Sequence, residues 1–395
     1  MIVEPKVRGF VCTTAHPEGC AANVKEQINY VKDQGTLEGP KNVLIIGAST
    51  GYGLASRIVA MAGCGANTLG VFFERPSNGK RTATAGWYNS VAFENEAVAA
   101  GLYAKSINGD AFSHEIKREA IEAIKKDMGK VDLIIYSLAA PRRIDPDTGE
   151  KYGSVLKPIG QSFKNKSIDF MKGLIIDAEI EPATDLEIVN TAKVMGGEDW
   201  QLWMTQLESA GVLAEGVKTV AYSYIGPEVT AAMYREGTIG RAKVHLENTA
   251  KSITESLKSI NGQAYVTVAK ALVTQASAAI PVVPLYMAAL YKVMKAKGTH
   301  EGCIEQIQRL FSDYLYSNDI LLDDEGRIRT DDLEMDPLTQ EEALRYFHQV
   351  TTETLEEDLH ISDYQSEFYK LFGFGLSEID YTKETDVMID VPSLR

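Results

Sequence analysis

A short glycine-rich turn between an apolar run and a helical pattern is the feature that most constrains how this chain can fold. Residues 41–74 read KNVLIIGASTGYGLASRIVAMAGCGANTLGVFFE. The run from Val43 to Ile46 fits a strand buried on both faces, the turn occupies residues 47–53, and a helical pattern leads into a second strand over residues 68–73. Strand, glycine-rich turn, helix and strand in this order form the βαβ unit that binds a dinucleotide.

The chemistry of this stretch favours NADH. Glycine lets the backbone touch a pyrophosphate because it has no Cβ, and the following helix directs free N–H groups and a partial positive charge at the phosphates. Glu74 ends the second strand, where a carboxylate accepts hydrogen bonds from ribose hydroxyls and repels a 2′-phosphate. Arg75, Lys80 and Arg81 follow and weaken this preference over NADPH. The GxxxGxG spacing resembles the turn of short-chain dehydrogenases/reductases.

Apolar segments alternate with helical patterns, which predicts an α/β fold with a Rossmann-type, doubly wound parallel sheet, extra helices and a small N-terminal β element. Six strands are predicted, at residues 43–46, 68–73, 103–107, 131–136, 219–227 (the strand with its exit loop) and 264–268. Because ligands of such sheets bind beyond the carboxyl ends of the strands, the first four exits should line one site. Those exits carry the turn 47–53, Glu74, Asp110, and Leu138 with Ala139.

Asp110 has two interpretations. The end of the third strand borders the adenine in doubly wound folds, so the carboxylate could accept a hydrogen bond from the adenine amino group. It could equally cap the helix predicted over residues 115–128, and both roles are compatible.

The chain is predicted to form one large Rossmann-type domain with three parts. These are an N-terminal hairpin and helix (1–40), an NAD-binding and catalytic core (41–300) with an insertion at 142–200, and an acidic helical extension (301–395). The extension holds 24 acidic and 7 basic residues, whereas residues 1–300 have a net charge of only +2. The last dozen residues are predicted to be a loose tail.

The loop-rich start of the insertion, residues 142–172, has 7 basic and 4 acidic residues. It is either a solvated loop or a basic lip for a phosphorylated substrate carrier.

Composition restricts the partners. The net charge of −15 argues against nucleic acid and anionic membranes. The most apolar stretch, residues 278–291, is short and contains two prolines, so no membrane span is predicted. The N-terminal residues lack a signal-peptide pattern, and four widely spaced cysteines without a CxxC pair suggest free thiols. We therefore expect a cytoplasmic protein without a metal site.

A tyrosine and a lysine follow the fifth strand at an unusual spacing. Tyr234 and Lys243 are nine positions apart, about half a turn out of phase on a straight helix. Tyr234 should therefore precede the helix, with Gly237 and Gly240 allowing a bend, and Lys243 should lie in its first turns. A lysine near the tyrosine and the cofactor ribose would lower the tyrosine pKa and stabilise its oxyanion.

Motifs along essentially the whole chain closely resemble those of the FabV-type enoyl-ACP reductases and the related trans-2-enoyl-CoA reductases. The motifs are RGFVCTTAHPEGC, GASTGYGLASR, GVFFERP, KSINGDAF, YSLAAPRR, VMGGEDW, YSYIGPE, Tyr-x8-Lys, LVTQASAAIPVVPLY and HEGCIEQ. Tyr-x8-Lys and MGGEDW are specific to this family among short-chain reductases. The chain departs from many members at Ala269, and at Arg235, where some bacterial relatives have Trp and the CoA-type enzymes have Arg.

The resemblance implies NADH-dependent reduction of the C2=C3 double bond of a trans-2-enoyl thioester, with hydride added to Cβ and a proton to Cα. It implies Tyr234 as proton donor, Lys243 as a cofactor ligand, and Tyr224 as a substrate contact able to donate a hydrogen bond to the thioester carbonyl. The residues it places around NAD are Gly47, Ala48, Ser49, Thr50, Gly51, Tyr52, Phe73, Glu74, Asp110, Ala111, Leu138, Ala139, Lys243, Leu272, Val273 and Thr274.

Three alternatives remain open from the sequence. The acyl carrier is either acyl carrier protein or CoA, since the basic segment suits both. A short-chain ketoreductase would need Tyr-x3-Lys, which is absent at Tyr234. A non-catalytic NADH sensor would not need the Tyr234 and Lys243 pair. Members of the family often work as monomers, and a monomer is expected here.

Overall fold

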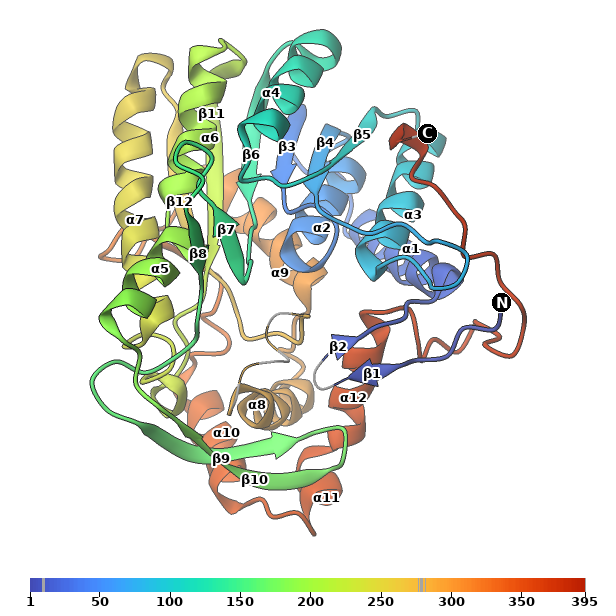
Figure 1. The fold of residues 1–395 in the computed structure, drawn as a ribbon, viewed down its shortest axis with the longest axis vertical. Helices are drawn as coiled ribbons and strands as arrows, with labels where there is room; N and C mark the ends of the chain where they lie inside the picture. Colours follow the sequence, from blue (N-terminus) through green and yellow to red (C-terminus); the bar gives the residue numbers. More distant parts are fainter. Residues whose placement is uncertain (9–10, 276, 278–279, 281, 395) are drawn as a thin grey trace.

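Seven parallel strands form the central sheet (Figure 1). The computed structural model describes residues 1–8, 11–275, 277, 280 and 282–394. The strands lie in the order β13-β12-β11-β6-β3-β4-β5, and every neighbouring pair is parallel. Their bounds are β3 (Asn42–Ile46), β4 (Asn67–Phe72), β5 (Ala104–Asn108), β6 (Val131–Tyr136), β11 (Leu213–Ser223), β12 (Gln263–Val268) and β13 (Ile328–Arg329).

The strand order confirms the predicted doubly wound fold. The chain enters the sheet at β3, runs outward to β5, and then crosses back to place β6 on the other side of β3. The switch point of the sheet therefore lies between β3 and β6, where such folds bind their ligands. All six predicted strands are present. The seventh, β13, was missed because a two-residue strand gives no periodic signal.

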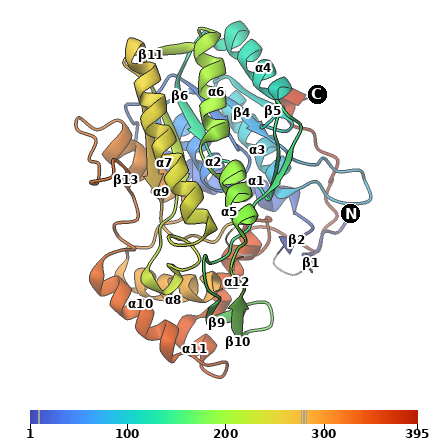
Figure 2. The same ribbon diagram turned by 60° about the vertical axis from the view of Figure 1, so that its left-hand side comes forward.

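Alternate side chains of the strands pack into two separate cores, one on each face of the sheet, because successive side chains of a strand point to opposite faces. Val43 and Ile45 pack in a core with α1, α2, α3 and α9, whereas Leu44 and Ile46 pack in a core with α4, α6 and α7. Figure 2 shows α6 and α7 side by side in front of the sheet. The bounds are α1 (Pro17–Asp33), α2 (Gly51–Ile58), α3 (Ala85–Ala99), α9 (Cys303–Arg309), α4 (His114–Ala123), α6 (Glu198–Ser209) and α7 (Thr238–Ser256).

A third core lies beyond the carboxyl ends of the strands. It joins the loop after β12 and the C-terminal helices to a hairpin, β9 (Phe163–Asp169) with β10 (Leu174–Ile180). At its centre is α8 (Val283–Lys297), whose side chains are buried on nearly all sides. Around it pack α10 (Pro337–Gln349), α11 (Leu355–Leu359) and α12 (Ile361–Lys370) (Figure 1). This core covers the edge of the sheet at which the dinucleotide turn opens.

The insertion at residues 142–200 contains regular secondary structure where loops were expected. It contains two antiparallel hairpins, β7 (Arg142–Ile144) with β8 (Lys151–Gly153) and β9 with β10, followed by α5 (Asp185–Met195). The expectation of loops over 142–172 is wrong because lysines and acids interrupt the apolar alternation of these strands. Helix α5 packs against α7, and its N-cap Thr184 forms a capping box with Glu187.

The C-terminal segment is not the predicted loose tail. The Ser393 Oγ atom donates to Glu94 on α3, and the Ser106 main-chain N–H of β5 donates to Ser393 Oγ, both at 2.8 Å. The Trp87 indole N–H donates to the main-chain oxygen of Ile389 at 2.7 Å. The segment therefore covers the end of the sheet at β5, which an exposed edge strand requires.

At the other end of the chain, β1 (Val7–Arg8) pairs with β2 (Val11–Cys12) as the predicted small hairpin, and Gly9 and Phe10 between them lie outside the described residues. His16 is the N-cap of α1, and its Nδ1 atom accepts from the Gly19 N–H.

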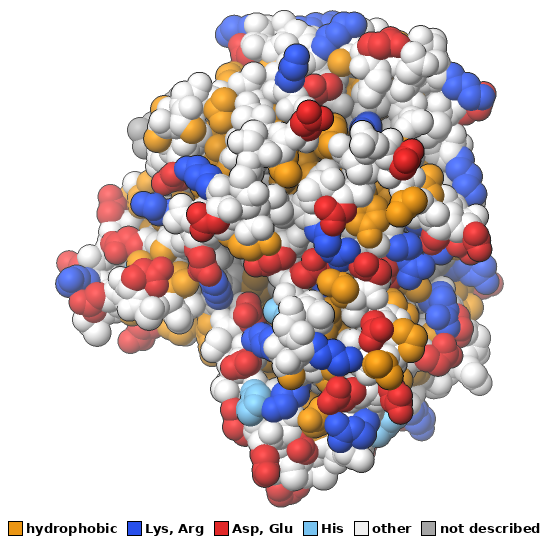
Figure 3. All heavy atoms as spheres, turned by 180° about the vertical axis from the view of Figure 1, so that it is seen from behind, with side chains coloured by type: hydrophobic (Ala, Val, Ile, Leu, Met, Phe, Trp, Pro, Cys, Tyr) orange, Lys and Arg blue, Asp and Glu red, His pale blue; other side chains and the backbone are white. Residues whose placement is uncertain are grey.

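The face in Figure 3 carries acidic and basic side chains intermixed across its surface. In the described part of the chain, each helix is too short or too polar to cross a lipid bilayer.

Candidate active site

Two glycines of the glycine-rich turn, Gly47 and Gly53, have no room for a side chain. Gly47 has φ of 90°, and a Cβ there would overlap the main-chain oxygen of Ser137 at the end of β6. A Cβ at Gly53 would overlap the main-chain oxygen of Gly47. The N-cap residue of α2 is Thr50, and its side chain makes no capping hydrogen bond. The Thr50 side chain therefore leaves the first N–H groups of α2 free at the turn. Free N–H groups at the start of a helix can bind an anion, which is the role predicted for this turn.

Glu74 lies directly over this turn. Ser49 Oγ donates to Glu74 Oε1 at 2.7 Å, so the carboxylate and the turn are joined. The Asn108 side chain holds the backbone of Glu74 on both sides: it accepts from the Glu74 N–H at 2.8 Å and donates to the Glu74 oxygen at 2.9 Å. Phe73 is 78% exposed beside it. Asn108 was missed by sequence reasoning, although it ends the strand that precedes Asp110.

The exit of β5 is fixed by a buried ion pair. Asp110 accepts from the Phe112 N–H, but the N-cap of α4 is Ser113, so the capping interpretation of Asp110 is wrong. Lys117 Nζ donates to the main-chain oxygens of Ala111 and Phe112, both at 2.9 Å, and to Asp199 at 2.7 Å. Burial lowers the pKa of Lys117 and raises the pKa of Asp199. This pair, unnoticed in the sequence, fixes the loop next to Ala111.

Two further predicted cofactor segments, residues 138–139 and 272–274, follow β6 and β12. Leu138 approaches Gly47 from the exit of β6, and Ala139 beside it is exposed. Beyond β12, the Val273 N–H donates to the Tyr291 hydroxyl at 2.8 Å, and the Thr274 N–H donates to Ser277 Oγ at 2.9 Å. The structure thus gathers the predicted segments 47–52, 73–74, 110–111, 138–139 and 272–274 at the carboxyl edge of the sheet.

Tyr234 precedes α7 and Lys243 lies within it, as the spacing predicts. Gly237 is the N-cap of α7, and Lys243 is the sixth helical residue. The Lys243 Nζ atom donates to the main-chain oxygen of Tyr222 at 2.8 Å. Burial lowers the pKa of Lys243 to about 8, against the opposing effect of Glu247. No hydrogen bond between Lys243 and Tyr234 is found among the described residues.

Tyr234 is nearly buried, with 8% of its surface exposed. Its ring meets the ring of Tyr224 edge to face, with centroids 4.8 Å apart and planes at 85°. Burial, with the negative charge of Glu334, raises the pKa of Tyr234 above its ordinary value. The expected lowering of this pKa by Lys243 is therefore not observed, and the environment keeps the hydroxyl protonated, as a proton donor needs.

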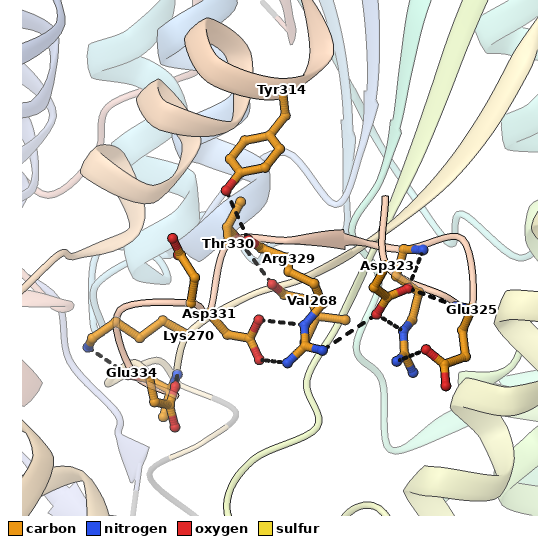
Figure 4. A network of polar contacts seen from close by, with 12 residues as sticks. Val268, Lys270, Tyr314, Asp323, Glu325, Arg329, Thr330, Asp331 and Glu334 are labelled. Atoms are coloured by element: carbon orange, nitrogen blue, oxygen red, sulfur yellow. Dashed lines mark hydrogen bonds and ion pairs between the residues drawn. The ribbon is translucent and has the colours of Figure 1, made fainter. Parts of the chain in front are cut away.

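Tyr224 is held by a residue from the C-terminal extension. Its hydroxyl donates to Glu334 Oε1 at 3.1 Å. Glu334, labelled in Figure 4, is completely buried, although its surroundings in the sequence, DDLEMDP, look like a solvated acidic loop. Sequence reasoning had no signal for it.

Three family models match the chain. Residues 2–79 match the NAD(P)H binding domain of trans-2-enoyl-CoA reductase, and residues 81–316, more than half of the chain, match the trans-2-enoyl-CoA reductase catalytic region. The chain belongs to the trans-2-enoyl-CoA reductase family. Residues 322–385 match a third model, described as the enoyl reductase FAD binding domain. The resemblance found in the motifs is thereby confirmed.

Relatives of this reductase family are similar over their full length. An enoyl-[acyl-carrier-protein] reductase [NADH] of Coxiella burnetii is 61% identical over 100% of this chain and 98% of its own. A trans-2-enoyl-CoA reductase [NADH] of Ruminiclostridium cellulolyticum is 56% identical over 100% of both chains. The crystal structure of Treponema denticola trans-2-enoyl-CoA reductase in complex with NAD covers 99% of each chain at 49% identity, with a TM-score of 0.95.

The third model names FAD, but residues 322–385 of this reductase do not fit a flavin nucleotide. The short strand β13 is followed by acidic residues, not by a glycine-rich turn into a helix. Phe347, Tyr364 and Phe368 fill the interior of the segment against α8. A flavin diphosphate would meet acidic side chains there and no glycine-rich backbone turn to hold it.

The basic segment at the start of the insertion, interpreted as either a solvated loop or a basic lip, is largely neutralised by ion pairs. Lys157 pairs with Glu187 at 2.7 Å, Lys164 with Glu179 at 2.8 Å, and Lys172 with Asp169 at 3.0 Å. Arg235, the second departure from the family pattern, pairs with Glu228 at the surface. Among the described residues there is no group of three or more His, Cys, Asp or Glu side chains that could hold a metal ion.

Proposed function

We propose that this chain catalyses the NADH-dependent reduction of the C2=C3 double bond of trans-2-enoyl thioesters to the saturated acyl thioester. One observation carries the proposal: the dinucleotide cradle at Gly47 and the paired rings of Tyr224 and Tyr234 belong to loops at the same edge of the sheet. The relatives that are 56–61% identical over the whole chain bear the names of enoyl thioester reductases that use NADH.

The residues at the cradle fit NADH. The clashes that a Cβ would cause at Gly47 and Gly53 show that the turn is folded tightly on itself and against the end of β6, which lets its backbone approach a pyrophosphate. Residues 47–52 would hold the diphosphate, Phe73 and Glu74 the adenine ribose, and Asp110 with Ala111 the adenine. Leu138, Ala139, Lys243 and residues 272–274 would hold the nicotinamide half. When bound, NADH supplies the hydride that adds to Cβ of the substrate.

The protein supplies the proton and the charge stabilisation. Hydride addition to Cβ moves the π electrons of the double bond toward the thioester, which leaves an enolate. The Tyr234 hydroxyl gives its proton to Cα of this enolate, and the resulting tyrosinate regains a proton from solvent. Tyr224 contacts the substrate beside it, and to bind the developing oxyanion its one hydroxyl proton would turn from Glu334 to the substrate.

The carrier and the surroundings of the enzyme are parts of the same proposal. The substrate is carried by acyl carrier protein or by CoA, because relatives with either name are similar to the whole chain. A ketoreductase or a non-catalytic NADH sensor is less well supported, since the family match covers the catalytic region and Tyr234 and Lys243 are both present.

We further propose a single-domain, monomeric enzyme in the cytoplasm that does not associate with nucleic acid or membranes. The core beyond the strand ends draws residues from Val3 to Val391, which supports one cooperative unit. The net charge of −15 disfavours nucleic acid and anionic membranes.

The deciding experiment is NADH oxidation with crotonyl-CoA, repeated with the crotonyl group on acyl carrier protein. Turnover with either substrate supports the proposed reaction, and the ratio of the two kcat/KM values identifies the carrier. Tight NADH binding without turnover of either substrate would instead support the sensor.

A further inference from the structure

Glu334 is a buried carboxylate that lies between β13 and α10, in the acidic extension of the chain. It has no exposed surface, and burial raises its pKa. Burying a carboxylate is costly unless hydrogen bonds compensate for the lost water. The structure provides them at both oxygens, and the groups that donate come from three other segments of the chain.

One carboxylate oxygen of Glu334 faces Tyr224, the proposed substrate contact. Glu334 Oε1 accepts from the hydroxyls of Tyr224, at 3.1 Å, and Tyr286, at 2.8 Å. Gln340 completes this cluster, since its Nε2 donates to the Tyr286 hydroxyl and to the Glu334 main-chain oxygen. Through Tyr224, the carboxylate also steadies the ring against which Tyr234 packs.

The other carboxylate oxygen of Glu334 faces Ala271, which directly precedes the loop proposed to contact NADH. Glu334 Oε2 accepts from the Ala271 N–H at 2.6 Å. The Ala271 carbonyl accepts from Lys270 Nζ at 3.0 Å, so two buried charged side chains hold this residue at its N–H and its C=O. Figure 4 shows these two side chains, Lys270 and Glu334. Residues 272–274, which follow directly, are the loop proposed to contact NADH.

We propose that Glu334 is a positioning residue for the reduction: its carboxylate ties the substrate-side Tyr224 to the cofactor-side loop 271–274. This inference rests on the proposed function. A carboxylate is suited to the task because a single rigid group accepts from both sides through charge-assisted hydrogen bonds, which are about twice as strong as neutral ones. A segment far along the sequence thereby fixes the spacing of the two halves of the site.

Glu334→Gln separates the two contacts. The amide oxygen can still accept from the Ala271 N–H, but the amide nitrogen must then donate to the tyrosine hydroxyls and reverse those hydrogen bonds. NADH affinity should stay within about twofold, whereas kcat should fall about 5- to 10-fold as neutral bonds replace charge-assisted ones. Glu334→Ala loses both contacts, so its Kd for NADH should also rise, by about 10-fold or more.

A double-mutant cycle with Tyr224→Phe tests whether Glu334 acts through Tyr224. In the Tyr224→Phe background, Glu334→Gln should change kcat by less than about twofold, because the hydroxyl that it positions is gone. A protein that only loses structure would show equal fold losses in both backgrounds. Equal losses, or a wild-type kcat for Glu334→Gln, would overturn the proposal.

Glu94→Gln is the matched control. Glu94 is also buried and accepts from two groups of Ser393, but it lies on α3 and shares none of the hydrogen-bond partners of Glu334. The Glu94→Gln variant should have a lower melting temperature than the wild type, with kcat and the Kd for NADH unchanged. If the wild-type enzyme itself does not reduce enoyl thioesters, the proposed function has failed, whereas wild-type turnover with additive losses rejects only the role of Glu334.

Discussion

The Lys243 ammonium donates to the main-chain oxygen of Tyr222 at 2.8 Å, and not to the hydroxyl of Tyr234. A strand residue thus holds the lysine at the cofactor edge of the sheet, while the tyrosine is oriented by other groups. The two residues that the sequence pairs by spacing are therefore positioned independently. The two proposed roles, proton donation by Tyr234 and cofactor binding by Lys243, can therefore be tested separately.

NADH binding should weaken above about pH 8. Burial lowers the pKa of Lys243 to about 8, so the side chain is cationic below this pH and neutral above it, where it loses its attraction for the cofactor. The Kd measured by NADH fluorescence should rise toward tenfold per pH unit between about pH 8 and 9.5.

Lys243→Met should bind NADH more weakly, by about 10- to 100-fold, and without this pH dependence. Lys270 is the necessary control, because burial also lowers its pKa to about 8. Lys270→Met should keep the rise in Kd. A rise that persists in Lys243→Met would assign the titration to another group.

Tyr234→Phe should lower kcat by about 10²- to 10⁴-fold, the usual contribution of a general acid. The Kd for NADH should change little, because the Tyr234 hydroxyl has no hydrogen bond among the described residues. Stopped-flow measurement of NADH oxidation gives kcat, and fluorescence titration gives Kd. Unchanged turnover would remove Tyr234 as the proton donor, and a parallel loss of NADH binding would indicate a structural defect.

The central sheet and its ligand edge could be predicted because their signals are local. Runs such as Val43 to Ile46 must be buried on both faces, and glycines are needed where a Cβ would meet Ser137 or Gly47. Four strand exits with compatible residues then converge on one edge by the geometry of parallel sheets. Tyr234 could be placed before α7 and Lys243 within it, because two residues nine positions apart do not lie on the same face of a straight helix.

The residues that hold the site together could not be predicted. Glu334 looks like any surface acid in an acidic segment, because its burial depends on α8 and α10 packing around it. Lys117 and Asp199 are 82 residues apart, and neither position has a local requirement for charge. The C-terminal residues looked loose since their partners, Trp87 and Glu94, lie about 300 positions earlier in the chain.

Glu74→Ala should narrow the preference for NADH over NADPH. The Glu74 carboxylate is held over the turn by Ser49, where it would repel a 2′-phosphate and accept from a 2′-hydroxyl. The ratio of kcat/KM for the two cofactors should fall by about tenfold. Gly86, near the start of α3, lies against the Glu74 carboxylate. Glu96→Ala is a suitable control, because Glu96 is half-buried on the same helix but about three turns further along it. An unaltered ratio in Glu74→Ala would exclude the ribose contact.

Lys117→Met should destabilise the protein by about 3–5 kcal/mol, because it leaves the buried Asp199 carboxylate without its cation. The variant also releases the main-chain oxygens of Ala111 and Phe112, so the Kd for NADH should rise. Urea unfolding gives the free energy, and fluorescence titration gives the Kd.

The double variant Lys117→Met/Asp199→Asn separates these two effects. Removing the unpaired charge should recover much of the stability, while NADH affinity should stay low because the released carbonyls of Ala111 and Phe112 are not recaptured. Lys105→Met is the control at a partly exposed pair, 3.9 Å from Asp127, and should cost less than about 1 kcal/mol. Recovery of both quantities in the double variant would show that the ion pair stabilises the fold alone, and that the loop next to Ala111 does not depend on Lys117.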